Sequence, residues 1–382
     1  MNRSRFITAC LCAIVLLSNA NGADTGKRNR FTTLDKGLSR LVTTEALTGA
    51  QVTIMKRGEI LFAGNYGNIA NTSDSKVDAN TRFLIASCSK PFASALTLSL
   101  VADEKESVTL SDTVDRWIPQ YPGAKIDNGS STTRAPTISE LLSHTGGIYS
   151  QKQKLTPKQT RLIRDFRQTL EQATLGIASV PLIAEPGTRF AYSGAGYCIL
   201  GRAMEIAAKQ PIETILQNRI CKPLDLQHTS FFPGRSGSTE NIATGVIPRS
   251  APHRLGKTHR FPLVGGSIYS TSKEMAIFAN AISESWNGRS NKLALPQGLV
   301  QELGKRRSSE SSYTLGWSMA KDGEITRLSH SGSLMAYKAW IAVELEPGIS
   351  MAACWTLREQ GTKPPVIPLL KQSFEKIGSS NE

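Results

Sequence analysis

The sequence predicts an α/β fold in which one antiparallel sheet is built from N- and C-terminal segments, is flanked by helices and carries an inserted, mainly helical domain. Three observations favour this fold. Strand-like segments occur near both ends of the chain, helical patterns fill its middle, and 382 residues with 40% hydrophobic content suit a globular protein. We expect the α/β part to cover residues 24–105 and 258–382, the insertion to cover 106–257, and the active site to lie between the two.

The N-terminal part predicts a helix followed by a hairpin. Apolar side chains recur on one helical face at Leu34, Leu38, Leu41 and Val42. Residues 51–55 and 59–63 then form two strand patterns around a Lys-Arg-Gly turn. Towards the other end, strands are predicted at 314–319, 339–345 and 349–355, and a terminal amphipathic helix at 366–377.

The middle of the chain has helical rather than strand periodicity. Loops rich in polar residues, Gly and Pro are expected at 121–136 and 230–257. The helical patterns cover residues 138–142, 158–173, 197–208 and 212–220.

The first 23 residues have the pattern of a signal peptide. A short basic region at 2–5 precedes an apolar stretch at 6–17, which is too short to span a bilayer. Small residues suit cleavage just after Ala20, and Gly22 and Ala23 offer neighbouring sites. The expected mature protein is exported, periplasmic or extracellular, and has no transmembrane segment.

Four cysteines remain after the expected cleavage, and none has metal-ligand spacing. Each lies among apolar or helix-pattern residues, which favours buried free thiols, with one disulfide left open as the alternative. They are Cys88, Cys198, Cys221 and Cys354. We expect no cofactor and no metal.

The chain is basic, with a formal net charge of +14. That charge favours contact with anionic surfaces such as an envelope polymer. Lys and Arg are scattered, and neither a Cys/His finger nor an aromatic-basic pattern is present, so no nucleic-acid partner is expected.

One stretch, Phe83-Leu-Ile-Ala-Ser-Cys-Ser-Lys90, joins an apolar run to a long helical pattern. A Ser at the first turn of a helix and a Lys three positions later face the same side, so Lys90 can lie beside the Ser87 hydroxyl as an activated nucleophile. The structural alternative is a serine N-cap followed by a surface lysine.

The Ser-x-x-Lys spacing alone is not specific, because it occurs five times in this chain. Context separates the copies. Ser73 lies in a polar loop, Ser318 in a predicted strand, Ser373 in the last helix, and Ser270 before a predicted capping box from Thr271 to Glu274. Only Ser87 leads into a helix of buried type.

The order of seven segments resembles the penicillin-recognising serine hydrolases, which include class C β-lactamases, DD-carboxypeptidases, D-aminopeptidases and β-lactamase-like esterases. The segments are FLIASCSK at 83, VTLSDTVDRWIPQY at 108, TISELLSHTGGI at 137, EPGTRFAYSGAGYCILG at 185, ICKPLDLQHTSFF at 220, GGSIYSTSKEMAIF at 265 and LSHSGSLMAYKAWIAV at 328. The resemblance implies that Ser87 is acylated and that Lys90 is its proton acceptor or electrostatic partner.

The second family motif, Tyr-x-Asn, is matched by Tyr192-Ser193-Gly194, which implies that Tyr192 is a general base or acid. A phenol is a weak base at its reference pKa near 10, but a nearby ammonium stabilises the phenolate. Gly194 departs from the motif, because it offers none of the amide hydrogen bonds of the usual Asn. This departure argues against β-lactamase activity.

The third motif, usually Lys-Thr-Gly, resembles His330-Ser331-Gly332, a substitution that some D-aminopeptidases and esterases of the family carry. The resemblance implies an oxyanion hole formed by the amides of Ser333 and Ser87. If His330 contacts a substrate carboxylate, it is a full cation only below a pH of about 6.5. His144 is interpreted as structural.

These observations predict an exported serine hydrolase that forms an acyl-enzyme with an ester or a D-amino-acid peptide, a small-molecule or peptide substrate of cell-envelope type. The alternatives are a β-lactamase or DD-carboxypeptidase acting on cell-wall peptides, and a binding protein on the same fold that does not turn its ligand over. The oligomeric state is left open.

Overall fold

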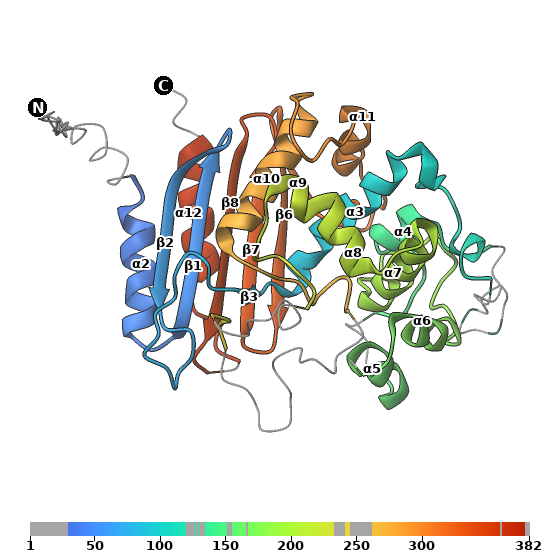
Figure 1. Ribbon diagram of the computed structural model, residues 1–382, viewed down its shortest axis with the longest axis horizontal. Helices are drawn as coiled ribbons and strands as arrows, with labels where there is room; N and C mark the ends of the chain where they lie inside the picture. Colours follow the sequence, from blue (N-terminus) through green and yellow to red (C-terminus); the bar gives the residue numbers. More distant parts are fainter. Residues whose placement is uncertain are drawn as a thin grey trace, which may run out of the picture.

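The computed structural model describes residues 30–119, 126, 129, 134–150, 155–165, 167–232, 241–244, 262–359 and 361–378. Its centre is a six-stranded antiparallel sheet in the order β2-β1-β8-β7-β6-β5 (Figure 1). The strands are β1 Leu47–Lys56, β2 Glu59–Gly67, β5 Ser318–Asp322, β6 Ile325–Leu334, β7 Tyr337–Glu344 and β8 Ile349–Leu357. Because β1 and β2 come from the start of the chain and the other strands from its end, the predicted architecture of the sheet is confirmed.

Helices cover both faces of this sheet. One face packs against α2 (Thr32–Thr43) and α12 (Val366–Gly378), where the rings of Trp340 and Phe374 meet edge to face. The opposite face packs against α10 (Ser272–Trp286). The alternation of side chains along each strand supplies an apolar surface to both layers.

The helix that follows Ser87, α3 (Ser89–Val101), lies beside α10 and is buried along almost its whole length. The two helices meet through stacked rings of Phe92 and Phe278, whose centroids are 4.0 Å apart. The helices of the middle of the chain lie alongside α3 or beyond it, on the side away from α2 and α12 (Figure 1). They are α4 Ile138–Leu142, α5 Pro157–Arg164, α6 Leu170–Ala178, α7 Gly194–Ala208, α8 Ile212–Leu216 and α9 Lys222–Leu224, while α11 Gln297–Val300 follows α10.

Two predicted elements differ from the structure. The single helix predicted at 158–173 is two helices, α5 and α6, because the side chain of Thr169 accepts a hydrogen bond from the Gln172 amide and starts a new helix. The strand predicted at 314–319 begins only at Ser318. Gly316 has a φ of +83° in a turn that the Thr314 amide closes onto the Trp317 carbonyl.

The capping box predicted after Ser270 is only half formed. Thr271 accepts a hydrogen bond from the Glu274 amide, as expected for an N-cap. The Glu274 carboxylate instead accepts hydrogen bonds from the His228 amide and the Thr229 hydroxyl. It therefore joins α10 to the segment that precedes residue 232.

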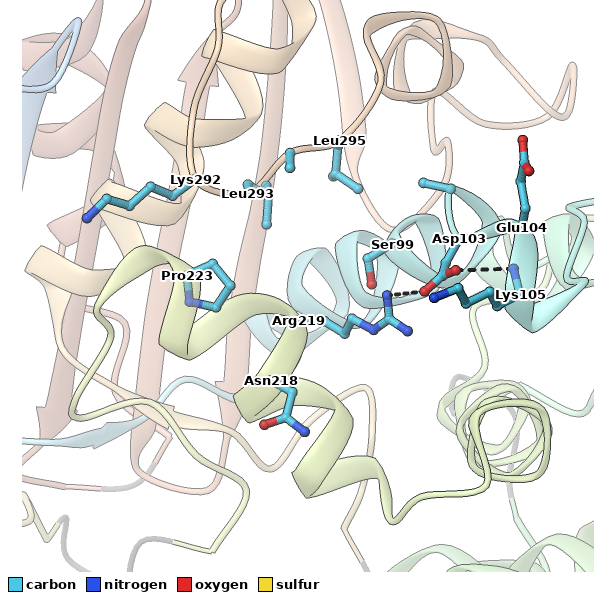
Figure 2. A pocket seen from close by; sticks show the side chains of 12 residues that line it. Ser99, Asp103, Glu104, Lys105, Asn218, Arg219, Pro223, Lys292, Leu293 and Leu295 are labelled. Atoms are coloured by element: carbon cyan, nitrogen blue, oxygen red, sulfur yellow. Dashed lines mark hydrogen bonds and ion pairs between the residues drawn. The ribbon is translucent and has the colours of Figure 1, made fainter.

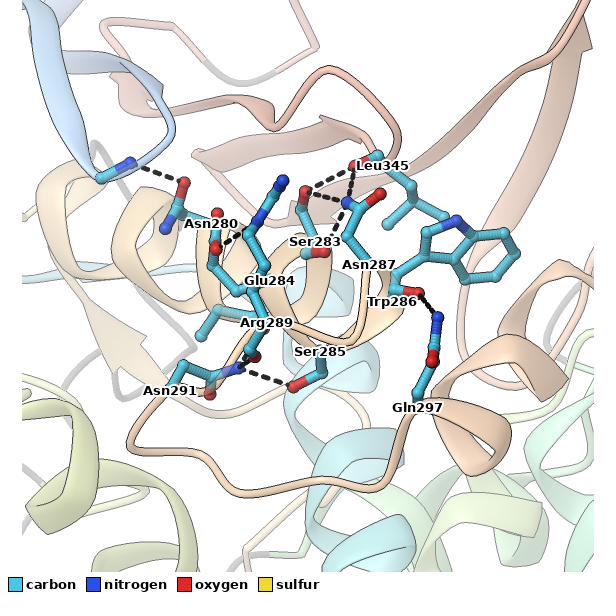
Figure 3. Close-up of polar contacts among 12 residues, drawn as sticks. Asn280, Ser283, Glu284, Ser285, Trp286, Asn287, Arg289, Asn291, Gln297 and Leu345 are labelled. Atoms are coloured by element: carbon cyan, nitrogen blue, oxygen red, sulfur yellow. Dashed lines mark hydrogen bonds and ion pairs between the residues drawn. The ribbon is translucent and has the colours of Figure 1, made fainter.

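The far end of α10 is tied to the turn after β7 (Figure 3). The Asn287 side-chain amide donates to the carbonyl oxygens of Ser283 and Leu345, at 2.8 and 2.6 Å, and the Ser283 hydroxyl also donates to Leu345. The side chain of Gln297 donates to the Trp286 carbonyl at 3.0 Å. These bonds satisfy carbonyls that a helix end leaves without partners, and they fix α10 against the sheet.

All four predicted cysteines are free and buried, as expected. Burial raises the pKa of the Cys88 and Cys198 thiols, so neither is a reactive thiolate. In the part of the chain that the structure describes, no helix has the length and apolar character needed to cross a membrane. The predicted signal peptide at 1–23, and most of the loops predicted at 121–136 and 230–257, lie outside the described residues.

Candidate active site

Ser87 lies in a short turn between a strand and the buried helix α3. The strand β3 (Phe83–Leu84) pairs with β4 (Tyr269–Ser270), and a single 3₁₀ turn, Ala86–Cys88, follows. Ala86 has a φ of +48°, a left-handed conformation that costs a non-glycine residue about 1 kcal/mol or more. No side-chain hydrogen bond caps this turn or α3, so Ser87 is not the N-cap of the structural alternative.

Lys90 is buried, with only 2% of its surface exposed, and is not the surface lysine of that alternative. Its ammonium lies 3.4 Å from the Ser87 hydroxyl and donates a 2.8 Å hydrogen bond to the Gly265 carbonyl. Among the described residues, no carboxylate forms an ion pair with it. A cation in such a setting stabilises negative charge that develops on the serine oxygen.

Tyr192 lies on the other side of this ammonium. The Lys90 nitrogen is 4.6 Å from the centroid of the Tyr192 ring and 5.2 Å from that of Tyr197. Within the described residues, the Tyr192 hydroxyl has no hydrogen-bond partner, while its backbone carbonyl accepts a hydrogen bond from Ser150 at 3.0 Å. The ring is held in place and its hydroxyl is available to a substrate.

His144 supports Tyr192 from behind. The two rings are 4.2 Å apart, and the Ser193 amide donates to Nδ1 of His144 at 3.0 Å. Because Nδ1 accepts this bond, the ring proton sits on Nε2, which is buried without a hydrogen-bond partner in the described structure. Burial and the nearby Lys90 charge hold the pKa of His144 well below its ordinary value, so the ring is neutral. Its contacts are those of a positioning residue, in keeping with the structural interpretation.

His330 is buried next to the same cluster and is fully engaged with protein partners. Its Nδ1 lies 2.9 Å from the Ser331 carbonyl, which only accepts, so Nδ1 carries the proton. Nε2 therefore accepts from the Tyr313 hydroxyl, at 3.0 Å. Burial and the Lys90 ammonium lower the pKa of His330 to about 3. The imidazole is neutral and has no N–H left for a substrate carboxylate, which removes the basis for the carboxylate contact predicted above.

The end of β6 lies against the Ala86–Cys88 turn. A Cβ added at Gly332 would be 2.1 Å from the Ile85 carbonyl oxygen, so only glycine permits this approach. Cys88 also donates a hydrogen bond from its thiol to the His330 carbonyl. Ser331 and Ser333, on either side of Gly332, are exposed. That the Ser333 and Ser87 amides form an oxyanion hole stays a prediction.

The structure adds residues to the site that the sequence did not single out. Gly265 accepts the Lys90 hydrogen bond, and a Cβ there would lie 3.1 Å from both the Lys90 nitrogen and the Tyr197 ring. Tyr313 holds His330, and Tyr197 donates to the Leu142 carbonyl at 2.9 Å. The feature of the sequence that could have indicated a close approach at this position is the Gly265-Gly266 pair. Gly194, in the place of the motif asparagine, is the first residue of α7 and is buried.

A separate pocket lies near the opposite end of α3 from Ser87 (Figure 2). Its Arg219 side chain is neutralised by ion pairs with Asp103 and Glu106, at 2.8 and 2.9 Å. A helix of the length of α3 spans about 20 Å, so this pocket is remote from Ser87. The described residues contain no group of His, Cys, Asp and Glu side chains that could hold a metal ion.

Comparisons with known proteins agree with this arrangement. A family model described as Beta-lactamase matches residues 34–366. The protein flp of Staphylococcus aureus (strain MRSA252) is 26% identical over 306 residues, which cover 77% of this chain and 56% of that protein, so the chain spans little more than half of this relative. Esterase EstB of Burkholderia gladioli is 25% identical over 312 residues, covering 74% of this chain and 76% of the esterase.

Among solved structures, EstCE1, described as a hydrolase with promiscuous acyltransferase activity, has a TM-score of 0.76 at 20% identity. The match covers 92% of this chain and 99% of that one. At this identity the likeness concerns the fold alone, and it confirms a β-lactamase-like architecture. The family model extends over most of the sequence and includes the Ala86–Cys88 turn, the Tyr192 segment and β6. This chain therefore belongs to the beta-lactamase family of serine hydrolases.

Proposed function

We propose that this protein hydrolyses carboxylic esters through an acyl-enzyme on Ser87. The observation that carries the proposal is the buried Lys90 ammonium, 3.4 Å from the Ser87 hydroxyl and without a carboxylate partner in the described structure. A serine is a poor nucleophile until a neighbouring group takes its proton and stabilises its charge. Lys90 and Tyr192 are the groups placed to do both.

In the proposed reaction, the Ser87 oxygen attacks the ester carbonyl carbon and its proton passes to the Lys90–Tyr192 pair, in which a Tyr192 phenolate accepts the proton and the Lys90 ammonium stabilises that phenolate. The amides of Ser87 and Ser333 receive the oxyanion of the tetrahedral intermediate. When the intermediate collapses, the alcohol leaves with the proton from the pair and the acyl group remains on Ser87. Water then repeats the sequence, releasing the acid and the free serine.

Two features favour an ester over an amide substrate. Gly194 has no side-chain amide with which to hold a peptide or lactam amide group. Both nitrogens of His330 are hydrogen-bonded within the protein, so the ring has no N–H left for the carboxylate of a peptide substrate. Esterase EstB, one of the relatives, carries this activity in its name. A D-amino-acid amide or peptide remains the other substrate class within the proposal.

The proposal includes the organisation expected from the sequence. The α/β part would comprise 24–105 and 258–382, the helical insertion 106–257, and the substrate would bind between them. The basic and apolar segments within residues 1–23 support export. N-terminal sequencing of protein recovered from the cell envelope or medium tests this point, and an N-terminus at Met1 would contradict it.

The deciding experiment labels the protein with a fluorescent fluorophosphonate and, separately, with a fluorescent penicillin, and maps the modified peptide by mass spectrometry. We expect fluorophosphonate on Ser87, none on a Ser87→Ala variant, and turnover of a chromogenic short-chain ester that exceeds that of the anilide with the same acyl group. Penicillin labelling of Ser87 would support the β-lactamase or DD-carboxypeptidase alternative. Absence of all labelling and turnover would support a binding protein.

A further inference from the structure

Ser89, the second residue after Ser87, is a buried polar residue that takes no part in the proposed reaction. It is the first residue of α3 and has no exposed surface. The Ser89 hydroxyl donates a 2.7 Å hydrogen bond to the Ala86 carbonyl and accepts a 3.1 Å hydrogen bond from the Ile268 amide. One hydroxyl therefore connects the Ala86–Cys88 turn to a segment that lies 179 residues further along the chain.

The 265–268 segment holds the start of α3 at three points. The carbonyl of its first residue accepts the 2.8 Å hydrogen bond of the Lys90 ammonium. Its last residue, Ile268, accepts a hydrogen bond from the Ile85 amide at 2.9 Å and donates one to Ser89. The proposed nucleophile lies between these anchored residues, so its position relative to the Lys90 ammonium depends on the three bonds.

The turn that Ser89 holds is strained. Ala86 has a φ of +48°, in the left-handed region that is unfavourable for a non-glycine residue. Such a conformation persists only where the surrounding structure fixes it, and the hydrogen bond from Ser89 to the Ala86 carbonyl is one of these restraints. Removal of the hydroxyl would release that carbonyl and leave the Ile268 amide without this partner in the protein interior. The Ser87 hydroxyl would then be free to move away from Lys90.

We propose that Ser89 is a positioning residue, whose hydroxyl holds the Ser87 oxygen beside the Lys90 ammonium. This inference rests on the proposed acyl-enzyme function and names a further residue on which that function depends. Ser89 is not a catalytic residue, because a side chain with no exposed surface does not touch a substrate. Displacement of a reacting group by about 1 Å lowers a rate by up to roughly 100-fold, so loss of the hydroxyl should lower kcat roughly tenfold to 100-fold.

The test compares Ser89→Ala with Ser99→Ala, which removes a hydroxyl from the same helix. The Ser99 hydroxyl donates to the Leu96 carbonyl at 2.7 Å, three residues before it, as Ser89 does to Ala86. Ser99 lies about 15 Å further along α3. We expect Ser89→Ala to lower kcat for a chromogenic ester roughly tenfold to 100-fold and to leave KM within about twofold of wild type. The rate of fluorophosphonate labelling at Ser87 should fall to a similar extent, and Ser99→Ala should change none of these values.

Two further measurements separate positioning from a loss of stability. Ser89→Thr keeps a hydroxyl and should retain at least about half of the wild-type kcat. Hydrogen exchange in the peptide that contains Ile268 should rise in Ser89→Ala and stay unchanged in Ser99→Ala. Urea unfolding establishes that each variant is folded in the assay. Wild-type kcat and labelling in Ser89→Ala, or a loss of the same size in Ser89→Thr or Ser99→Ala, would overturn the proposal.

The labelling rate also separates this inference from the proposed function. If the wild-type protein turns over no ester but is labelled at Ser87, and Ser89→Ala is labelled slowly, the esterase function is wrong and the positioning role stands. If the ester is hydrolysed and Ser89→Ala matches wild type, the positioning role is wrong and the esterase function stands. A wild-type protein that is neither labelled nor active would overturn both.

Discussion

Gly265 offers a specific perturbation of the proposed catalytic lysine. In Gly265→Ala the new Cβ would lie 3.1 Å from the Lys90 nitrogen and 3.1 Å from the Tyr197 ring, closer than ordinary van der Waals contact. Tyr197 is fully buried and its hydroxyl is bound to the Leu142 carbonyl, so it has little room to move. The Lys90 side chain is then the group that must shift, by a few tenths of an ångström.

The size of the effect follows from the bonds that Lys90 makes. Its 3.4 Å contact with Ser87 is already long, and its 2.8 Å bond to Gly265 fixes the ammonium in place. Hydrogen bonds to charged groups contribute about 1.5–3 kcal/mol, and loss of this alignment in the transition state would lower kcat roughly tenfold to 150-fold. Overpacking would also destabilise the fold by about 1–3 kcal/mol.

The assay measures kcat for a chromogenic ester and the rate of Ser87 labelling by fluorophosphonate, together with the free energy of unfolding in urea. Gly266→Ala is the matched control, because its Cβ would meet only the flexible end of the Leu263 side chain, at 2.9 Å. We expect a folded Gly265→Ala variant with slow turnover and slow labelling, and a control close to wild type. Wild-type kcat and labelling in Gly265→Ala would refute the requirement for a fixed Lys90.

Three further predictions concern the surrounding cluster. The pKa of His330 is about 3 in the folded state and near 6.5 in the unfolded chain. Between these two pH values the unfolded chain binds a proton on His330 that the folded protein does not bind. The free energy of unfolding therefore falls as the pH falls from 6.5 towards 3, by up to about 1.4 kcal/mol per pH unit. Urea unfolding at pH 7 and pH 5 should therefore show a smaller loss in His330→Gln than in wild type, and identical losses would contradict the assignment. Tyr313→Phe removes the donor to Nε2 of His330 and should lower the free energy of unfolding in urea by about 1–3 kcal/mol. The control is Tyr149→Phe, whose hydroxyl is buried without a partner in the described structure, and it should lower the free energy of unfolding by less than about 0.5 kcal/mol. Equal losses in the two variants would argue against the hydrogen bond. Gly332→Ala should lower kcat/KM for the ester at least about tenfold, because its Cβ would overlap the Ile85 carbonyl. Gly298→Ala, which has open space around its Cβ, is the control. A Gly332→Ala variant with wild-type kcat/KM would mean that β6 can move away from the Ala86–Cys88 turn without loss of activity.

Local patterns predicted much of the fold correctly. The 3.6-residue apolar spacing from Leu34 to Val42 gave α2, and the alternation on each side of the Lys-Arg-Gly turn at 56–58 gave the β1–β2 hairpin. Elements were wrong where a single residue overrode the pattern. The Thr169 N-cap divides the helix predicted at 158–173 into α5 and α6. The positive φ of Gly316 places the start of β5 at Ser318, four residues after the predicted start at 314. Neither the cap nor the positive φ changes the hydrophobic periodicity, so the periodicity could not indicate where these two elements begin.

The sequence by itself singled out Ser87 and Lys90, because their three-residue spacing and the following helix bring them together through local geometry. Tyr192, Gly265 and His330 are far from Ser87 in the chain, and only the packing of β6, the 265 segment and the turn before α7 places them around Lys90. Their protonation was decided in the same way. The motif position suggested a histidine that binds anions, but burial, the Lys90 charge and two protein hydrogen bonds keep His330 neutral, because the pKa of a side chain depends on its three-dimensional surroundings and not on its neighbours in sequence.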